Sequence, residues 1–81
     1  MSEKIRQVPA KKVIKVLESL GFVQVRQKGS HVFMQHPDGR ITVIPVHSGK
    51  DLGKGLVWKL LQDVKLSRDE WLELLKSLII F

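Results

Sequence analysis

Three histidines are the first residues in this sequence to suggest chemistry, because imidazole is the side chain that gains and loses protons near neutral pH. They are His31, His36 and His47. The sequence has no cysteine, which excludes thiol nucleophiles, disulfides and cysteine-ligated zinc. No two histidines have the i, i+4 spacing of a helical metal site, and no dense carboxylate cluster accompanies them. We therefore expect neither a metal nor a cofactor.

His31 is the strongest candidate for a catalytic residue. It directly follows Gly29-Ser30, a two-residue connection typical of a β-hairpin, and Arg26 and Lys28 lie just before it. An imidazole in this setting can take the proton of an RNA 2′-hydroxyl whose oxygen attacks the adjacent phosphorus, while cations stabilise the developing charge. The pattern is therefore compatible with metal-independent RNA cleavage. From spacing alone, a histidine at the exit of a hairpin is more often an ordinary surface residue.

The other two histidines have different settings. His47 lies two residues after Pro45, in a segment leading to Lys50. It is a candidate for a second acid or base, or for an RNA contact, and the alternative is a loop histidine bonded to its own backbone. His36 adjoins Pro37 at a predicted turn, so we expect it to be exposed to solvent and inert.

Further residues could hold the RNA chain. Lys50 and the run Gly53-Lys54-Gly55 precede a predicted helix, whose N-terminus attracts phosphate, although glycine there could equally serve as a simple cap. Phe33 could stack on a base or be covered by a partner protein. The predicted RNA contacts are Arg26, Lys28, Ser30, Phe33, Lys50 and Lys54.

Charge supports a polyanionic partner. The 81-residue chain has a net charge of +6, and residues 1–54 hold 10 of its 14 Lys/Arg but only 4 of its 8 Asp/Glu. A surface of this kind binds nucleic acid by displacing counterions from phosphates. No apolar run is long enough to span a bilayer and the N-terminus lacks a signal sequence, so we expect a cytoplasmic protein without membrane association.

The elements that position these residues follow from hydrophobic spacing. A helix is predicted between Pro9 and Gly21, and a second one from Leu56 onward. Ser67 and Glu70 form a capping box that begins a short third helix. Trp58 and Trp71 are expected in the core or at an interface. Three strands are predicted in between, at residues 22–28, 31–36 and 40–45.

The predicted fold is α+β, with the order α-β-β-β-α and an added C-terminal helix. The three strands form an antiparallel sheet, and the helices cover one of its faces. Alternation places Val32 and Met34 toward the helices and His31 and Phe33 on the open face. In the first strand both Phe22 and Val23 are core candidates, so its parity stays open.

With 81 residues the chain is long enough for one compact core and too short for two, so we expect a single domain over residues 1–81. Its short motifs follow one another in a specific order: Gly21-Phe22, Gly29-Ser30-His31, Asp38-Gly39, Pro45-Val46-His47, Gly49-Lys50 and Gly55. Together they resemble the HicA family of prokaryotic toxins, from about Pro9 to Leu75. The resemblance implies a fold like that of double-stranded-RNA-binding domains. It also implies ribonuclease activity on mRNA and a HicB antitoxin that masks the active site. The family's catalytic histidine matches His31, and its Pro-x-His element matches His47.

The sequence leaves rival hypotheses open. A non-catalytic RNA-binding module would need the same basic surface but no catalytic histidine, and would bind RNA without cutting it. A pure interaction protein would use the open sheet face and the apolar C-terminus to bind another protein. The tail from Lys76 to Phe81 has no function that the resemblance explains.

Overall fold

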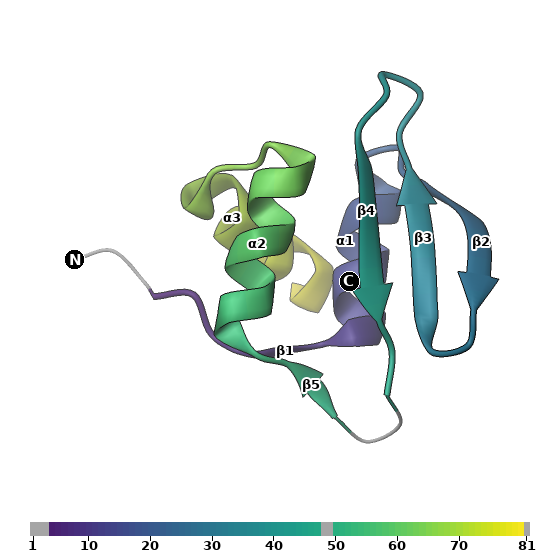
Figure 1. The fold of residues 1–81 in the computed structure, drawn as a ribbon. Coiled ribbons are helices and arrows are strands. Elements are labelled where there is room, and N and C mark those ends of the chain that lie inside the picture. The colour runs from purple at the N-terminus through teal and green to yellow at the C-terminus, as the bar shows by residue number, and fades with distance from the viewer. Residues whose placement is uncertain (1–3, 48–49, 81) are drawn as a thin grey trace.

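A computed structural model describes residues 4–47 and 50–80 of the chain. Three helices and a three-stranded sheet make up most of it, and two short strands pair with each other beside them (Figure 1). In chain order the elements are β1 (Val8–Pro9), α1 (Ala10–Ser19), β2 (Val23–Lys28), β3 (His31–Gln35), β4 (Ile41–Pro45), β5 (Asp51–Leu52), α2 (Lys54–Val64) and α3 (Arg68–Ile80).

The larger sheet has the order β2-β3-β4, and both of its strand pairs are antiparallel. All three helices lie on one side of it (Figure 1). The side chains of Val32, Met34, Thr42 and Ile44 are buried beneath these helices, as alternation along a one-sided sheet requires. The predicted α+β fold, with its α-β-β-β-α order and added C-terminal helix, is confirmed.

One core joins the helices to the inner face of the sheet. Helix α1 contributes Val13, Val16 and Leu17, which are fully buried and follow helical spacing. Trp71 of α3 is also fully buried, so its predicted place in the core is confirmed. Trp58 of α2 is 43% exposed and stays outside the core.

The C-terminal helix is longer than the sequence suggested. The capping box is present, since the Glu70 amide donates to Ser67 Oγ at 3.1 Å and the Ser67 amide donates to Glu70 Oε1 at 3.0 Å. The hydrogen bond from the Ser67 amide holds the pKa of the Glu70 carboxyl below its usual value. The prediction of a short third helix was wrong, because α3 runs for 13 residues and is the longest of the three described helices.

The pairing of β1 with β5 was not predicted. Val8 lies opposite Leu52 and Pro9 opposite Asp51, in antiparallel register. Strands of two residues carry no periodic signal, so the hydrophobic pattern of the sequence did not predict them. The pairing anchors the N-terminal stretch, which enters α1, beside the chain that enters α2 (Figure 1). Over the described residues, no helix has the length and apolar character that a membrane span needs.

Candidate functional site

The open face of the larger sheet carries His31 at one end. His31 is the first residue of β3, and the register places it between Lys28 of β2 and Pro45 of β4. Its side chain is exposed, as the sequence predicted. Nothing in the described part of the chain forms a hydrogen bond or ion pair with its imidazole. The His31 imidazole is therefore accessible to a ligand, and Lys28 of the neighbouring strand lies opposite it.

The next row of this face combines a cation with an aromatic ring. Arg26, Phe33 and Val43 lie side by side across the three strands. The Arg26 guanidinium carbon lies 5.5 Å from the centroid of the Phe33 ring, within cation–π range. The pair forms a platform on which a nucleic-acid base could stack, one pleat away from His31.

The far row of the open face is mostly apolar. It consists of Val23, Gln35 and Ile41, and both Val23 and Ile41 are 55% exposed. The face therefore changes along the strands, from cationic beside His31 to apolar at the opposite end. Exposed apolar side chains in this arrangement suit a protein partner better than solvent.

A β-bulge sets the parity of β2, which the sequence had left open. The register shifts between Gln24 and Arg26, so that both Val23 and Arg26 reach the open face. Phe22, just before the strand, is buried instead. A bulge inserts one residue into the alternation of side chains between the two faces, and the sequence of β2 has no pattern that predicts it.

His47 and Lys50 gather near the same end of the sheet as His31. The Val46 amide donates to the Ser30 carbonyl at 2.6 Å, which holds the chain before His47 against the β2–β3 turn. The Lys50 amide donates to the His47 carbonyl at 3.1 Å. His47 and Lys50 line a pocket at the start of α1 together with Lys11, and Asp51 lines it as well. Two of the predicted RNA-binding residues are thus brought together.

Lys11 was not predicted as a site residue. The available signal was its place on the cationic face of the first helix, but only the fold shows that the helix starts beside His47. Helix α1 also begins without a side-chain cap and without an acidic residue in its first turn. Its N-terminal amides therefore add positive potential to the same pocket.

Lys54 lies elsewhere. It is the first residue of α2, which begins two residues earlier than the predicted start at Leu56. It lines a different pocket, with Lys4, Trp58 and Arg68 among its neighbours. The predicted contacts therefore divide into three places. Arg26, Lys28, Ser30 and Phe33 belong to the sheet and its first turn, Lys50 joins His47, and Lys54 lies apart from both.

The prediction that His36 is exposed was wrong. Its side chain is 20% exposed, and its Nε2 lies 3.0 Å from the Leu20 carbonyl oxygen. Its Nδ1 accepts a hydrogen bond from the Asp38 amide at 3.1 Å, and its ring packs edge-on against Phe22 at a centroid distance of 5.0 Å. Both ring nitrogens are engaged, so His36 has a structural position.

Arg40 completes the corner around His36. Its Nη1 donates to the Val64 carbonyl at 2.6 Å and its Nε donates to Asp38 Oδ2 at 2.8 Å. The guanidinium carbon also lies 5.1 Å from the centroid of the Phe22 ring. The hydrogen bond from Arg40 holds the pKa of the Asp38 carboxyl below its usual value.

Comparison with known proteins identifies a family. A family model described as the HicA toxin of bacterial toxin-antitoxin matches residues 10–66. No curated protein matches this sequence. The matched segment contains β2, β3 and β4 with His31, and also His47 and Lys50. Since the match covers more than half of the 81 residues, this chain belongs to the HicA toxin family of bacterial toxin–antitoxin systems.

Proposed function

We propose that this toxin is a metal-independent endoribonuclease that cleaves mRNA in the cytoplasm, with His31 as its catalytic residue. The observation that carries the proposal is the position of His31, an exposed histidine with an unengaged imidazole beside Lys28 on the open sheet face. A group that must take a proton from a substrate needs this accessibility. The family match supports a toxin role for the chain.

The reaction needs one base, one acid and a stabiliser of negative charge. His31 takes the proton of a 2′-hydroxyl, and the 2′-oxygen attacks the adjacent phosphorus. The bond to the 5′-oxygen of the next nucleotide breaks, leaving a cyclic phosphate and a 5′-hydroxyl. Lys28 stabilises the charge that develops on the phosphoryl oxygens. His47 is the candidate that donates the proton to the departing 5′-oxygen.

The same surface can hold a single RNA strand. The platform of Arg26 and Phe33 offers a stacking surface for a base next to the reactive phosphate. Lys50 and Lys11, in the pocket at the start of α1, offer contacts to neighbouring phosphates. Ser30 contributes through its carbonyl, which ties the turn before His31 to Val46.

The family also implies an antitoxin, and we propose a HicB-type protein that covers the open face. The apolar row at the far end of this face supports that proposal, since Val23 and Ile41 are exposed there and RNA cleavage does not require them. Val43 extends the exposed apolar surface into the middle row. A partner resting on this row would extend over Phe33 and His31 and exclude RNA from them.

The test compares wild type with His31→Ala on a defined RNA in excess EDTA. Gln35→Ala is the matched control, because Gln35 is exposed on the same face of the same strand. We expect His31→Ala to slow cleavage by about 10²–10⁴-fold, the usual contribution of a general acid or base. The control should cleave like wild type, and all three proteins should melt at the same temperature. A requirement for a divalent metal, or normal cleavage by His31→Ala, would contradict the mechanism.

The alternative function is a toxin that binds RNA without cutting it, because the platform of Arg26 and Phe33 could bind a base without any catalysis by His31. In that case RNA affinity would fall steeply with salt concentration, and wild type and His31→Ala would bind equally well without forming product.

A further inference from the structure

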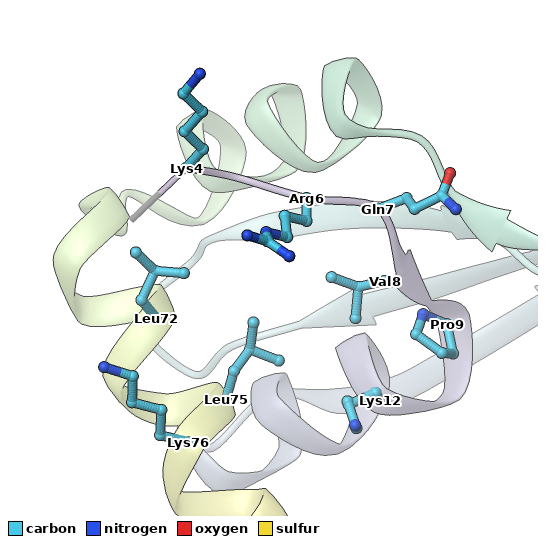
Figure 2. A pocket seen from close by; sticks show the side chains of 9 residues that line it. All are labelled: Lys4, Arg6, Gln7, Val8, Pro9, Lys12, Leu72, Leu75 and Lys76. Atoms are coloured by element: carbon cyan, nitrogen blue, oxygen red, sulfur yellow. The ribbon is translucent and has the colours of Figure 1, made fainter. Parts of the chain in front are cut away.

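A groove lies on the side of the molecule away from the open sheet face. It runs between the N-terminal stretch and α3, and its volume is about 250 Å³. Figure 2 shows Val8 on one wall, facing Leu72 and Leu75, which project from α3. Its interior is therefore apolar, and its two walls come from opposite ends of the chain.

Cations lie along the walls of this apolar interior; the Arg6 guanidinium points toward it, whereas the Lys4 side chain extends away from it (Figure 2). Lys4 and Arg6 belong to the N-terminal stretch and Lys12 to the first turn of α1 (Figure 2). No acidic residue is among those that line the groove in the described parts of the chain. The acids of α3 lie on another face of the helix, where Asp69, Glu70 and Glu73 line a separate pocket. The groove therefore attracts a ligand that is both acidic and apolar.

A protein segment fits this description better than RNA does. Among the residues that the structure describes, no aromatic side chain lines the groove, so they offer bases no stacking surface there. RNA phosphates would engage the cations but would leave the leucines unused. A peptide with acidic and apolar side chains satisfies both sets, because apolar contact at the centre and complementary charge at the rim are the usual anatomy of a protein interface.

The groove also lies mostly outside the part of the chain that the family model matches. That match begins at residue 10 and ends at residue 66, so Lys12 is inside it, whereas Lys4, Arg6, Leu72 and Leu75 are not. Most of the groove's lining therefore comes from segments outside the match, and the groove lies apart from His31 and the open sheet face.

We propose that this groove binds an acidic, apolar segment of the toxin's own antitoxin. The proposal rests on the antitoxin pairing proposed above and adds a second contact to it. An antitoxin that covers the open face and also fills the groove holds the toxin from both sides. Two linked contacts of this kind raise affinity and favour the antitoxin that carries both.

The experiment measures binding of the purified antitoxin to Arg6→Glu and to Lys59→Glu. Both residues are exposed and both substitutions change the net charge equally, but Lys59 lies on α2 outside the groove. We expect Arg6→Glu to weaken antitoxin binding by about tenfold or more. The loss should shrink as salt is added, and Lys59→Glu should stay within about twofold of wild type.

A photo-crosslinking residue provides a readout that does not depend on charge. Placed at Gln7, which lines the groove, it should form a covalent adduct with the antitoxin. Placed at Gln62, an exposed residue on α2, it should not. Equal antitoxin binding by wild type and Arg6→Glu, or absence of the Gln7 adduct, overturns the proposal, and so does a wild-type protein that fails to bind the antitoxin.

RNA cleavage by the same variants separates this proposal from the nuclease proposal. Arg6→Glu should cleave RNA like wild type when no antitoxin is present. If Arg6→Glu instead loses RNA binding and keeps the antitoxin, the groove is a nucleic-acid surface and the inference is wrong. If wild type cuts no RNA but binds the antitoxin through the groove, the nuclease proposal fails while the groove stands.

Discussion

Two histidines at opposite ends of one strand have opposite surroundings. His31 begins β3, is exposed, and has no bonding partner for its imidazole within the described residues. His36 directly follows β3, and both of its ring nitrogens are engaged, by the Leu20 carbonyl and the Asp38 amide. At one end of β3 the imidazole is therefore accessible to a ligand, and at the other the His36 ring with its two hydrogen bonds forms a structural clamp.

The difference shows that residue type alone does not identify a catalytic group. A histidine whose nitrogens are committed to backbone groups exchanges protons with a substrate only by breaking those bonds. A histidine with both nitrogens open has no such cost. The number of engaged ring nitrogens, rather than the nearness of a turn, distinguishes the two ends of β3.

The largest expected effect is that His36→Ala and His31→Ala differ in opposite senses: the first should lower stability and the second should lower the rate of RNA cleavage. His36→Ala should lower the free energy of unfolding by about 1–3 kcal/mol, because it leaves the partly buried Leu20 carbonyl without its partner. His31→Ala should change that free energy by less than about 0.5 kcal/mol, since its side chain is exposed. Urea unfolding measures both values.

Cleavage measured on the same samples completes the comparison. At a temperature where it is fully folded, His36→Ala should cut RNA at the wild-type rate, whereas His31→Ala should cut about 10²–10⁴-fold more slowly. If folded His36→Ala fails to cut RNA, then His36 also affects cleavage, and the proposed division between a structural His36 and a catalytic His31 is wrong.

The open face could be predicted from the sequence because its signals are local. The Gly29-Ser30 connection and the alternation along residues 31–36 specify a hairpin, and alternation alone places His31 and Phe33 together. The structure confirms both placements. The bulge in β2 has no such local signal, and Val23 and Arg26 could not be assigned to one face without it.

The His36 corner could not be predicted because its contacts are distant in sequence. The Leu20 carbonyl is 16 residues from His36, and the Val64 carbonyl is 24 residues from Arg40. A turn such as Pro37-Asp38-Gly39 suggests exposure for its neighbours, and only the packing of α1 and α2 against the sheet reverses that expectation. For the same reason the sequence did not predict that Lys11 shares a pocket with His47, since only the tertiary fold brings the two residues together.

A smaller effect is expected at the glycine beside the clamp. Gly21 has a φ of +102°, and a Cβ atom there would lie 3.0 Å from His36 Nε2. Gly39 also has a φ of +102°, but a Cβ there would meet nothing within 4 Å. Both alanine variants carry the same backbone strain, of about 1–2 kcal/mol. Gly21→Ala should lose about 1 kcal/mol more, because it also displaces the His36 ring.

A double-mutant comparison isolates this contact. In a His36→Ala background the extra cost of Gly21→Ala over Gly39→Ala should disappear, since the obstructing ring is gone. Thermal and urea unfolding of the variants measure the difference. If the extra loss of stability in Gly21→Ala persists in the His36→Ala background, the added methyl group is obstructed by another neighbour and not by the His36 ring.

The smallest expected effect is a pH dependence of stability that arises from Asp38, which lies beside Arg40 and His36. The hydrogen bond from Arg40 lowers the pKa of the Asp38 carboxyl in the folded state below its ordinary 3.8. The unfolded chain therefore binds this proton at higher pH than the folded chain does. The stabilisation is present above about pH 4 and is lost as the pH falls through the folded value.

Asp38→Asn removes this dependence. The variant should be slightly less stable than wild type at neutral pH, and the two should converge as the solution is acidified below about pH 4. Urea midpoints recorded along an acid titration test this expectation. If the urea midpoints of the two proteins change in parallel with pH, the Asp38 carboxylate does not stabilise the fold. Arg40 would then be held by its contacts with Val64 and Phe22 alone, and the structural clamp at His36 would not depend on the charge of Asp38.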